Sequence, residues 1–230
     1  LGAGDGSFQA FTNFLVDAGP LGAPAADLNG DGFVDIVTGN YKSSGTVSVL
    51  LGNGNGTFQP TRNFTTGDGA LFPVIADVNG DGKPDIVTGN YRAGTVSVLR
   101  GDGHGDFVTQ PEITVGAYAA FVSVADVNGD SRLDIISPNG DDTVSVLLNQ
   151  GNGAGGDVTF ASQSVIPTTE FPFAVGIADF NGDGKPDLAS AHRSDDTVRL
   201  QLGVGNGTFG PEVSFPVGDT PYAMVVADVN

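Results

Sequence analysis

The chain has no cysteine and no tryptophan among its 230 residues, and only nine residues are lysine or arginine. Without cysteine, neither a disulfide bond nor a thiolate metal site can form. Nine basic residues cannot easily supply the positive face that phosphate groups require, so nucleic acid is not expected as a partner. No apolar run approaches membrane-spanning length, and no secretory leader is evident. We therefore expect no membrane insertion, and the chain resembles a mature or excised segment.

Acidic residues and glycine are abundant instead. The chain carries 27 aspartate and glutamate residues, a formal charge of −18, 36 glycines and 13 prolines. Such a composition occurs in disordered chains, but 39% of the residues are hydrophobic and they recur at a regular period. This combination favours many short strands joined by tight turns.

A nine-residue acidic loop recurs four times between short apolar segments. It reads Asp-x-Asn-Gly-Asp-Gly-x-x-Asp, except that Ser131 replaces the second glycine of the third copy. The steps between successive loops are 50, 49, 53 and 49 residues, the last leading to a fifth copy that the chain end interrupts at Asn230. The loops begin at Asp27, Asp77, Asp126, Asp179 and Asp228.

Carboxylates and an amide at alternate positions around a glycine turn are the ligands that Ca²⁺ requires. We predict four Ca²⁺ sites, each using side-chain oxygens from loop positions one, three, five and nine and the carbonyl oxygen of position seven. The predicted ligands are Asp27, Asn29, Asp31, Phe33 and Asp35; Asp77, Asn79, Asp81, Lys83 and Asp85; Asp126, Asn128, Asp130, Arg132 and Asp134; and Asp179, Asn181, Asp183, Lys185 and Asp187.

Two other kinds of loop share some of these features. A polar β-turn without metal is one, but a turn needs one aspartate rather than three at alternate positions. An EF-hand requires a glutamate at position twelve, where these loops have Thr38, Thr88, Ser137 and Ser190. If the sixth position requires a positive φ, Ser131 is strained by about 1 kcal/mol and the third site is the weakest.

The segments around each loop have a constant order. An apolar run precedes the loop, a second run such as Asp35–Thr38 follows, and then comes Thr-Val-Ser-Val-Leu, as in Thr46–Leu50. A glycine-rich turn that ends in phenylalanine and a variable segment complete the unit. Four short strands in roughly 50 residues, with no helical periodicity, predict an all-β fold of four-stranded β-propeller blades. The run before the loop is expected to be the innermost strand, buried on both faces, with the alternating strand farther out.

These units resemble the FG-GAP or VCBS repeat of integrin α-subunit propellers and many secreted microbial proteins. The resemblance covers essentially the whole chain, and its most specific part is the acidic loop leading into Asp-Ile-Val. It implies that the loop joins the first and second strands of a blade and holds one Ca²⁺ at the rim.

We predict one propeller region over residues 1–230. Its blades are expected at about 20–67, 68–116, 117–169 and 170–218, with partial blades at 1–19 and 219–230. Propellers of this family have six to eight blades, so the chain is expected to be part of something larger. An alternative is an open stack in which chains self-assemble through their incomplete terminal blades.

The predicted function is that of a secreted or cell-surface, non-enzymatic adhesion or recognition module with a protein or glycan ligand. A structural repeat segment of a fibre or matrix is the alternative, and a carbohydrate-binding or lyase-associated propeller is a third. His104 and His192 have no recognisable catalytic partners, and His192 is expected just after an inner strand. Arg100-Gly101-Asp102 matches an integrin-recognition tripeptide, but it occupies a turn position of the repeat where drift alone produces it.

Overall fold

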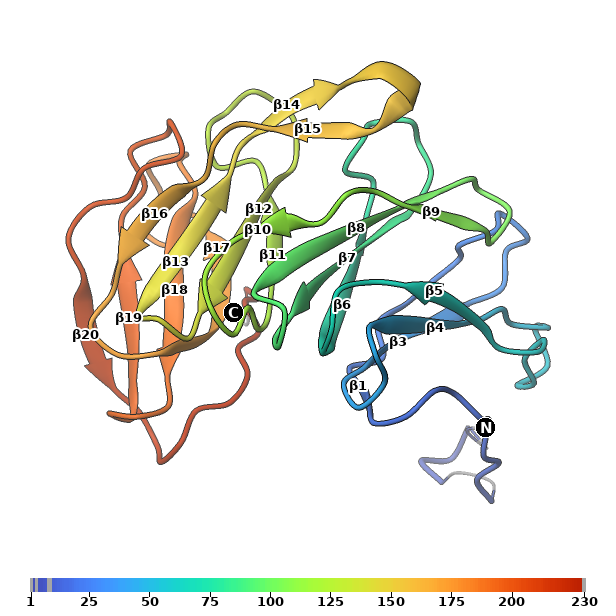
Figure 1. The fold of residues 1–230 in the computed structure, drawn as a ribbon. Helices are drawn as coiled ribbons and strands as arrows, with labels where there is room; N and C mark the ends of the chain where they lie inside the picture. The colour runs from blue at the N-terminus through green and yellow to red at the C-terminus, as the bar shows by residue number, and fades with distance from the viewer. Residues whose placement is uncertain (1, 3, 8–9, 229–230) are drawn as a thin grey trace.

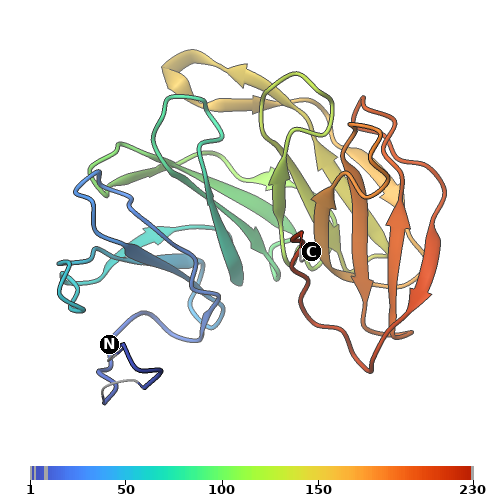
Figure 2. The same cartoon turned by 180° about the vertical axis from the view of Figure 1, so that it is seen from behind.

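The structure is a computed structural model that describes residues 2, 4–7 and 10–228. Four antiparallel sheets follow one another along the sequence and stand side by side around an open arc (Figures 1 and 2). Within the described residues there is no α-helix, and the only helical element is the 3-10 turn η1 (Ala154–Gly156). The predicted all-β propeller architecture is therefore confirmed, and the arc is not closed.

Each sheet is one blade. The first blade contains β1 (Pro20–Leu21), β2 (Ala25–Ala26), β3 (Asp35–Asn40), β4 (Thr46–Leu50) and β5 (Arg62–Thr65). The second contains β6 (Ala70–Ala76), β7 (Asp85–Asn90), β8 (Thr95–Gly101), β9 (Phe107–Thr109) and β10 (Ile113–Thr114). The third contains β11 (Ser123–Ala125), β12 (Asp134–Asn139), β13 (Thr143–Leu147) and β16 (Ser164–Pro167). The fourth contains β17 (Pro172–Ala178), β18 (Asp187–His192), β19 (Thr197–Gln201) and β20 (Val213–Pro216).

The acidic loops occupy the same place in every blade. Each loop connects the first strand to the second, and the second strand then pairs with both the first and the third, as β7 pairs with β6 and β8. A parallel bridge between Phe121 and Ala174 links the entry of the third blade to the first strand of the fourth. The first strands of these two blades therefore run in the same direction, and their acidic loops lie on the same rim of the arc.

The second strand, not the first, is the most deeply buried one. All six residues of β7, β12 and β18 are buried, whereas β6 ends in three half-buried residues. The expectation of a first strand buried on both faces was therefore wrong for β6. The Thr-Val-Ser-Val-Leu strand also has two buried faces, because each blade is covered by its neighbours. Val47 and Val49 enter a hydrophobic core on one face, and Ser48 is fully buried on the other.

Side-chain hydrogen bonds link the polar groups of this buried face. Asn40 Nδ2 donates to the hydroxyl oxygens of Ser48 (2.9 Å) and Thr46 (3.0 Å), and Ser48 donates to Asn63. Asn90 and Asn139 donate to the corresponding threonine and serine of their own blades. Because buried polar groups are costly unless they are paired, these contacts make the polar strand face compatible with burial.

Close backbone contacts join adjacent blades. A Cβ atom at Gly89 on β7 would overlap the carbonyl oxygen of Ala120, at the entry of the third blade. Gly39 faces Ala70 in the same way, with its would-be Cβ 2.9 Å from the carbonyl oxygen. Glycine at this position therefore permits the tight contact between the first two pairs of blades.

The third repeat is longer because it contains an additional hairpin, which the sequence analysis did not anticipate. Strands β14 (Asn149–Asn152) and β15 (Val158–Phe160) pair with one another outside the four-stranded sheet. No strand occurs within residues 10–19 or 217–228. The partial blades predicted at both ends also include residues 1, 3, 8–9 and 229–230, which lie outside the described residues. No helix in the described chain is long and apolar enough to span a membrane.

Candidate metal centres

Each acidic loop wraps its backbone around the first aspartate. In the first loop, Asp27 Oδ1 accepts hydrogen bonds from the N–H of Gly30 (2.7 Å) and of Asp31 (3.2 Å), and Oδ2 accepts from the N–H of Gly32 (2.8 Å). Gly30 and Gly32 adopt φ values of 75° and 84°, which glycine tolerates without a steric penalty. These donors, foremost the N–H of Gly32, hold the pKa of Asp27 below its usual range. The carboxylate is therefore preserved as an anion.

The third and fifth loop positions are also held by local turns. Asn29 Oδ1 accepts from the N–H of Asp31 at 3.0 Å, and Asp31 Oδ1 accepts from the N–H of Phe33 at 2.8 Å. The same contacts recur at Asn79 and Asp81, at Asn128 and Asp130, and at Asn181 and Asp183. The third and fifth side chains are therefore held in the same way in all four loops.

The ninth position has a second role that the sequence analysis missed. Asp35 is fully buried, and its carboxylate accepts from the N–H of Leu28 (2.8 Å) and from the N–H of Gly52 (2.7 Å). It therefore connects the loop to the turn after the third strand. Asp85, Asp134 and Asp187 make the equivalent two contacts in their own blades.

Burial governs the protonation of this position. It raises the pKa of Asp35, and the negative charges of Asp31 and Asp27 raise it further. Burial also raises the pKa of Asp134, and it raises that of Asp85 to about 6. A buried carboxylate beside two other carboxylates is electrostatically unfavourable, and a bound cation reduces this repulsion.

The third loop adopts the predicted strained conformation. Ser131 has a φ of 66°, close to the values of Gly32, Gly82 and Gly184 at the same loop position. Its N–H still donates to Asp126 Oδ2 at 2.7 Å, as Gly32 donates to Asp27. The positive φ expected for this position is therefore confirmed.

The residues of each loop fit Ca²⁺ by donor chemistry. They offer carboxylate and amide oxygens only, and three of the four side chains are acidic, as a hard divalent cation requires. Among the described residues, no three acidic or histidine side chains already converge as a metal cluster, because the ninth aspartate is directed to backbone donors. In Asp35, each oxygen accepts one of these bonds and retains a second lone pair. The assignment of all twenty predicted ligands to Ca²⁺ stays a prediction.

Basic side chains of the chain itself neutralise two loops. Lys185 Nζ lies 3.9 Å from Asp183 Oδ2, and Arg132 forms an ion pair with Asp130. Both are seventh-position residues, whose carbonyl oxygens were predicted as ligands. Their side chains fold back over the loop and reduce its negative charge.

The other sequence candidates lie elsewhere. Arg100 is in β8, where it pairs with Asp157 at 3.5 Å and donates to the carbonyl oxygen of Gly155. The tripeptide that begins at Arg100 thus contains the last two residues of β8 and the residue after it. His192 is the last residue of the second strand β18 and fully buried, so its expected place after an inner strand was wrong. His104 lies on the exposed turn between β8 and β9.

Comparisons with known proteins support the repeat and the fold. The sequence profile of the FG-GAP-like repeat matches residues 27–88, 77–137, 126–190 and 179–230. A comparison with curated protein sequences finds no match. An Agrocybe aegerita lectin structure, which concerns specific recognition of non-reducing terminal N-acetylglucosamine, shares 25% identity over 83% of this chain and 51% of that chain, with a TM-score of 0.53.

Two further solved structures share the fold alone. A Lactobacillus plantarum protein is 12% identical, with 92% of this chain and 57% of that chain covered and a TM-score of 0.55. BBS1N, in complex with ARL6DN, is 13% identical, with 89% and 59% covered and a TM-score of 0.56. The chain therefore spans between about half and three fifths of the length of these structures.

Proposed function

The chain belongs to the FG-GAP-like repeat family, and from this premise we propose that it is a calcium-stabilised, non-enzymatic recognition module that works outside the cell. The observation that carries the proposal is the fourfold recurrence of one acidic loop geometry at the same end of successive blades. Weak oxygen-ligand calcium sites suit extracellular fluid, where dissociation constants of about 10⁻⁴–10⁻³ M are typical. Calcium would fix the loops and leave the remaining surface for a ligand.

The buried titratable groups make structural contacts, and this supports a non-catalytic role. Asp35 and Asp85 hold backbone N–H groups, and His192 contacts the carbonyl oxygen of Glu170 and the hydroxyl of Ser190. A catalytic acid or base must instead face a substrate. These groups are engaged in contacts that hold the parts of a single blade in place.

Calcium titration of the chelated protein tests this proposal. We expect about four ions per chain and a rise in melting temperature, because bound metal relieves repulsion among the loop carboxylates. Mg²⁺ at the same concentration is the control, since it is smaller and prefers to keep its water ligands. A melting temperature that is the same with and without calcium would contradict the proposal.

Glycan recognition is the second candidate, and the lectin likeness favours it. That lectin recognises a non-reducing terminal N-acetylglucosamine, and it shares 25% identity with this chain. We propose that the ligand of the module is a glycan rather than a protein. Binding to an array of immobilised glycans in the presence of calcium tests this choice, and retention of no glycan above background would contradict it.

A further inference from the structure

A cavity lies between the second and third blades, away from the acidic loops. It has a volume of about 450 Å³ and is open to solvent. It is lined by β10 and the residues before it in one blade, and by β15 and the residues after it in the next. Ligand pockets are typically 300–1,000 Å³. The hairpin exists only in the third repeat, so the chain has one such cavity among its described residues.

Gln110 gives this cavity a polar group that lacks a partner. The residue is buried, with a relative exposure of 7%, and among the described residues its Nε2 atom has no hydrogen-bond partner. The backbone N–H of Gln110 donates to the carbonyl oxygen of Val98 at 2.9 Å, which fixes the residue at the cavity. A buried amide donor left unpaired is unfavourable, so the position favours a ligand that offers an acceptor.

A second glutamine that precedes a proline lies in the first blade and is exposed. Gln59 lies one residue after the phenylalanine that ends the glycine-rich turn, whereas Gln110 lies three residues after it. The N–H of Gln59 donates to the carbonyl oxygen of Leu51, just after β4, rather than to a residue within the strand. Gln59 is exposed and does not line the cavity, so it provides a surface control for Gln110.

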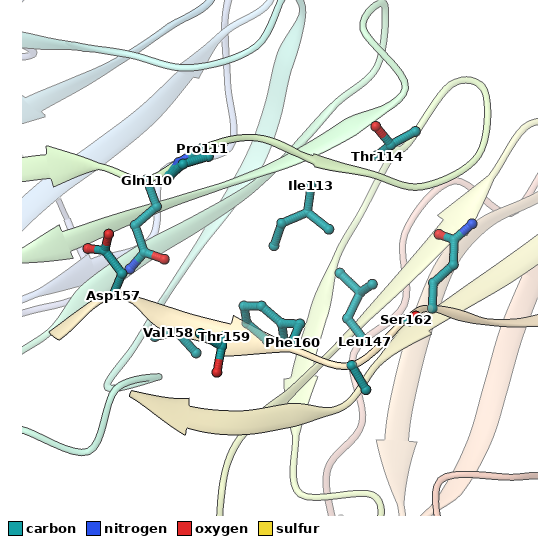
Figure 3. Close-up of a pocket in the computed structure, with 12 residues that line it drawn as sticks. Gln110, Pro111, Ile113, Thr114, Leu147, Asp157, Val158, Thr159, Phe160 and Ser162 are labelled. Atoms are coloured by element: carbon teal, nitrogen blue, oxygen red, sulfur yellow. The ribbon is translucent and has the colours of Figure 1, made fainter. Parts of the chain in front are cut away.

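The remaining walls separate into a polar end and an apolar middle (Figure 3). Asp157 lies beside Gln110 at one end, and the side chains of Ile113, Leu147 and Phe160 face one another across the middle. Asp157 is paired with Arg100 Nη2 at 3.5 Å, so the carboxylate is balanced by a positive charge. A site with an amide, a neutralised carboxylate and an apolar wall suits a neutral ligand that combines polar groups with a methyl group.

We propose that this cavity binds an N-acylated amino sugar, which rests on the glycan form of the proposed function. The acyl carbonyl oxygen would accept from Gln110 Nε2, and the acyl methyl group would lie among Ile113, Leu147 and Phe160. Hydroxyl groups of the sugar ring would donate to Asp157. Glucose lacks the acyl methyl group and the acyl carbonyl group. Glucosamine carries a positive charge, which gains little at this site because Arg100 already balances the charge of Asp157.

Equilibrium titrations of the full chain in calcium test the site, with N-acetylglucosamine, glucosamine and glucose as probes. We expect one saturable site for N-acetylglucosamine, at least about 10-fold weaker binding of the other two, and a similar loss in Gln110→Leu. Gln59→Leu should bind like the parent. In the parent, the side-chain amide resonance of Gln110 should shift on titration, which gives a readout that does not depend on a variant folding.

Several results would overturn the inference: no saturable binding, equal binding of glucose, equal loss in both glutamine variants, or tighter binding of an N-acetylated peptide. The calcium count is measured on the same samples. About four calcium ions without sugar binding would refute this site and leave the calcium proposal intact. Sugar binding without calcium uptake would refute the calcium proposal alone.

Discussion

His192 Nδ1 lies 2.9 Å from the carbonyl oxygen of Glu170, at the strand position where the three preceding blades have a buried asparagine. A carbonyl oxygen can only accept, so Nδ1 carries the proton and Nε2 accepts from the hydroxyl of Ser190 at 2.8 Å. Arg199 stands where the other blades have Ser48, Ser97 and Ser145, and it pairs with Asp195 and Glu212. The fourth blade has therefore exchanged a neutral asparagine–serine contact for a histidine beside an arginine.

This exchange predicts a stability that depends on pH. Burial, foremost, and the charge of Arg199 lower the pKa of His192 to about 4 from an ordinary value of 6.5, although Glu170, Asp195 and Asp142 oppose the shift. Between these values the unfolded chain binds a proton that the folded chain does not. The contribution of neutral His192 is thus complete above pH 6.5 and is lost as the pH falls toward 4, by roughly 3 kcal/mol in total.

His192→Asn tests this dependence, because asparagine is the residue of the other blades. We expect the free energy of unfolding of the variant to fall less than that of the parent between pH 6.5 and 4. Urea denaturation at several pH values measures the difference. Parallel pH profiles for the two proteins would show that His192 is not the group responsible.

Asp85→Asn and Asp81→Asn separate the structural carboxylate from the loop carboxylate. Asp85 accepts from the N–H groups of Gly101 and Val78, and an amide nitrogen in place of one oxygen would face a donor. We expect a loss of about 2 kcal/mol with or without calcium. Asp81 is exposed and accepts from Lys83 N–H through one oxygen, which asparagine can keep.

Asp81→Asn should therefore lower stability only when calcium is present. Thermal melts of both variants in calcium and in chelator give the four values needed. Equal, calcium-dependent losses in the two variants would mean that Asp85 acts as a metal ligand alone. Equal, calcium-independent losses would remove Asp81 from the metal site.

The parts of the molecule that depend on local sequence could be predicted. The order of the strands and the turn at Ser131 follow from residues close together in the chain, and both agree with the structure. The buried face of Ser48 could not be predicted, because an alternating strand is ordinarily half exposed and only the neighbouring blade covers it. The hydrogen bond from the N–H of Gly52 to Asp35 could not be predicted either. It joins residues that are 17 positions apart and depends on the strand pairing between them.

The cavity at Gln110 also could not be predicted from the sequence. Gln110 is buried and lines a cavity together with residues of β15 in the next blade, whereas Gln59, which also precedes a proline, is exposed. The β14–β15 hairpin that supplies these residues occurs only in the third repeat of the described chain. The step of 53 residues was the available signal that the third repeat contains something extra.

Ser131→Gly should strengthen the third calcium loop. Serine at a φ of 66° is strained, and glycine relieves this at the cost of a more flexible unfolded chain. We expect a net gain of up to about 1 kcal/mol and tighter calcium binding at one of the four sites. Gly82→Ser, at the same loop position of the second blade, should have the opposite effect. A loss of stability in Ser131→Gly would instead assign the serine hydroxyl a favourable contact.

Gly89→Ala tests whether the blades depend on their close backbone contact. The added methyl group would overlap the carbonyl oxygen of Ala120, and neither group is the end of a flexible side chain that can turn away. The second and third blades would have to separate, which disturbs the hydrophobic core to which Val87 of one blade and Ile135 of the other both belong. We expect a loss of about 1–3 kcal/mol in the free energy of unfolding, the usual cost of overpacking.

Gly218→Ala is the control, since no atom lies within 4 Å of its would-be Cβ and its φ is not positive. Urea denaturation of both variants measures the difference, and equal stability would show that the interface yields without cost. An unchanged slope of unfolding free energy against urea would place the effect in the folded interface, because that slope reports the surface exposed on unfolding.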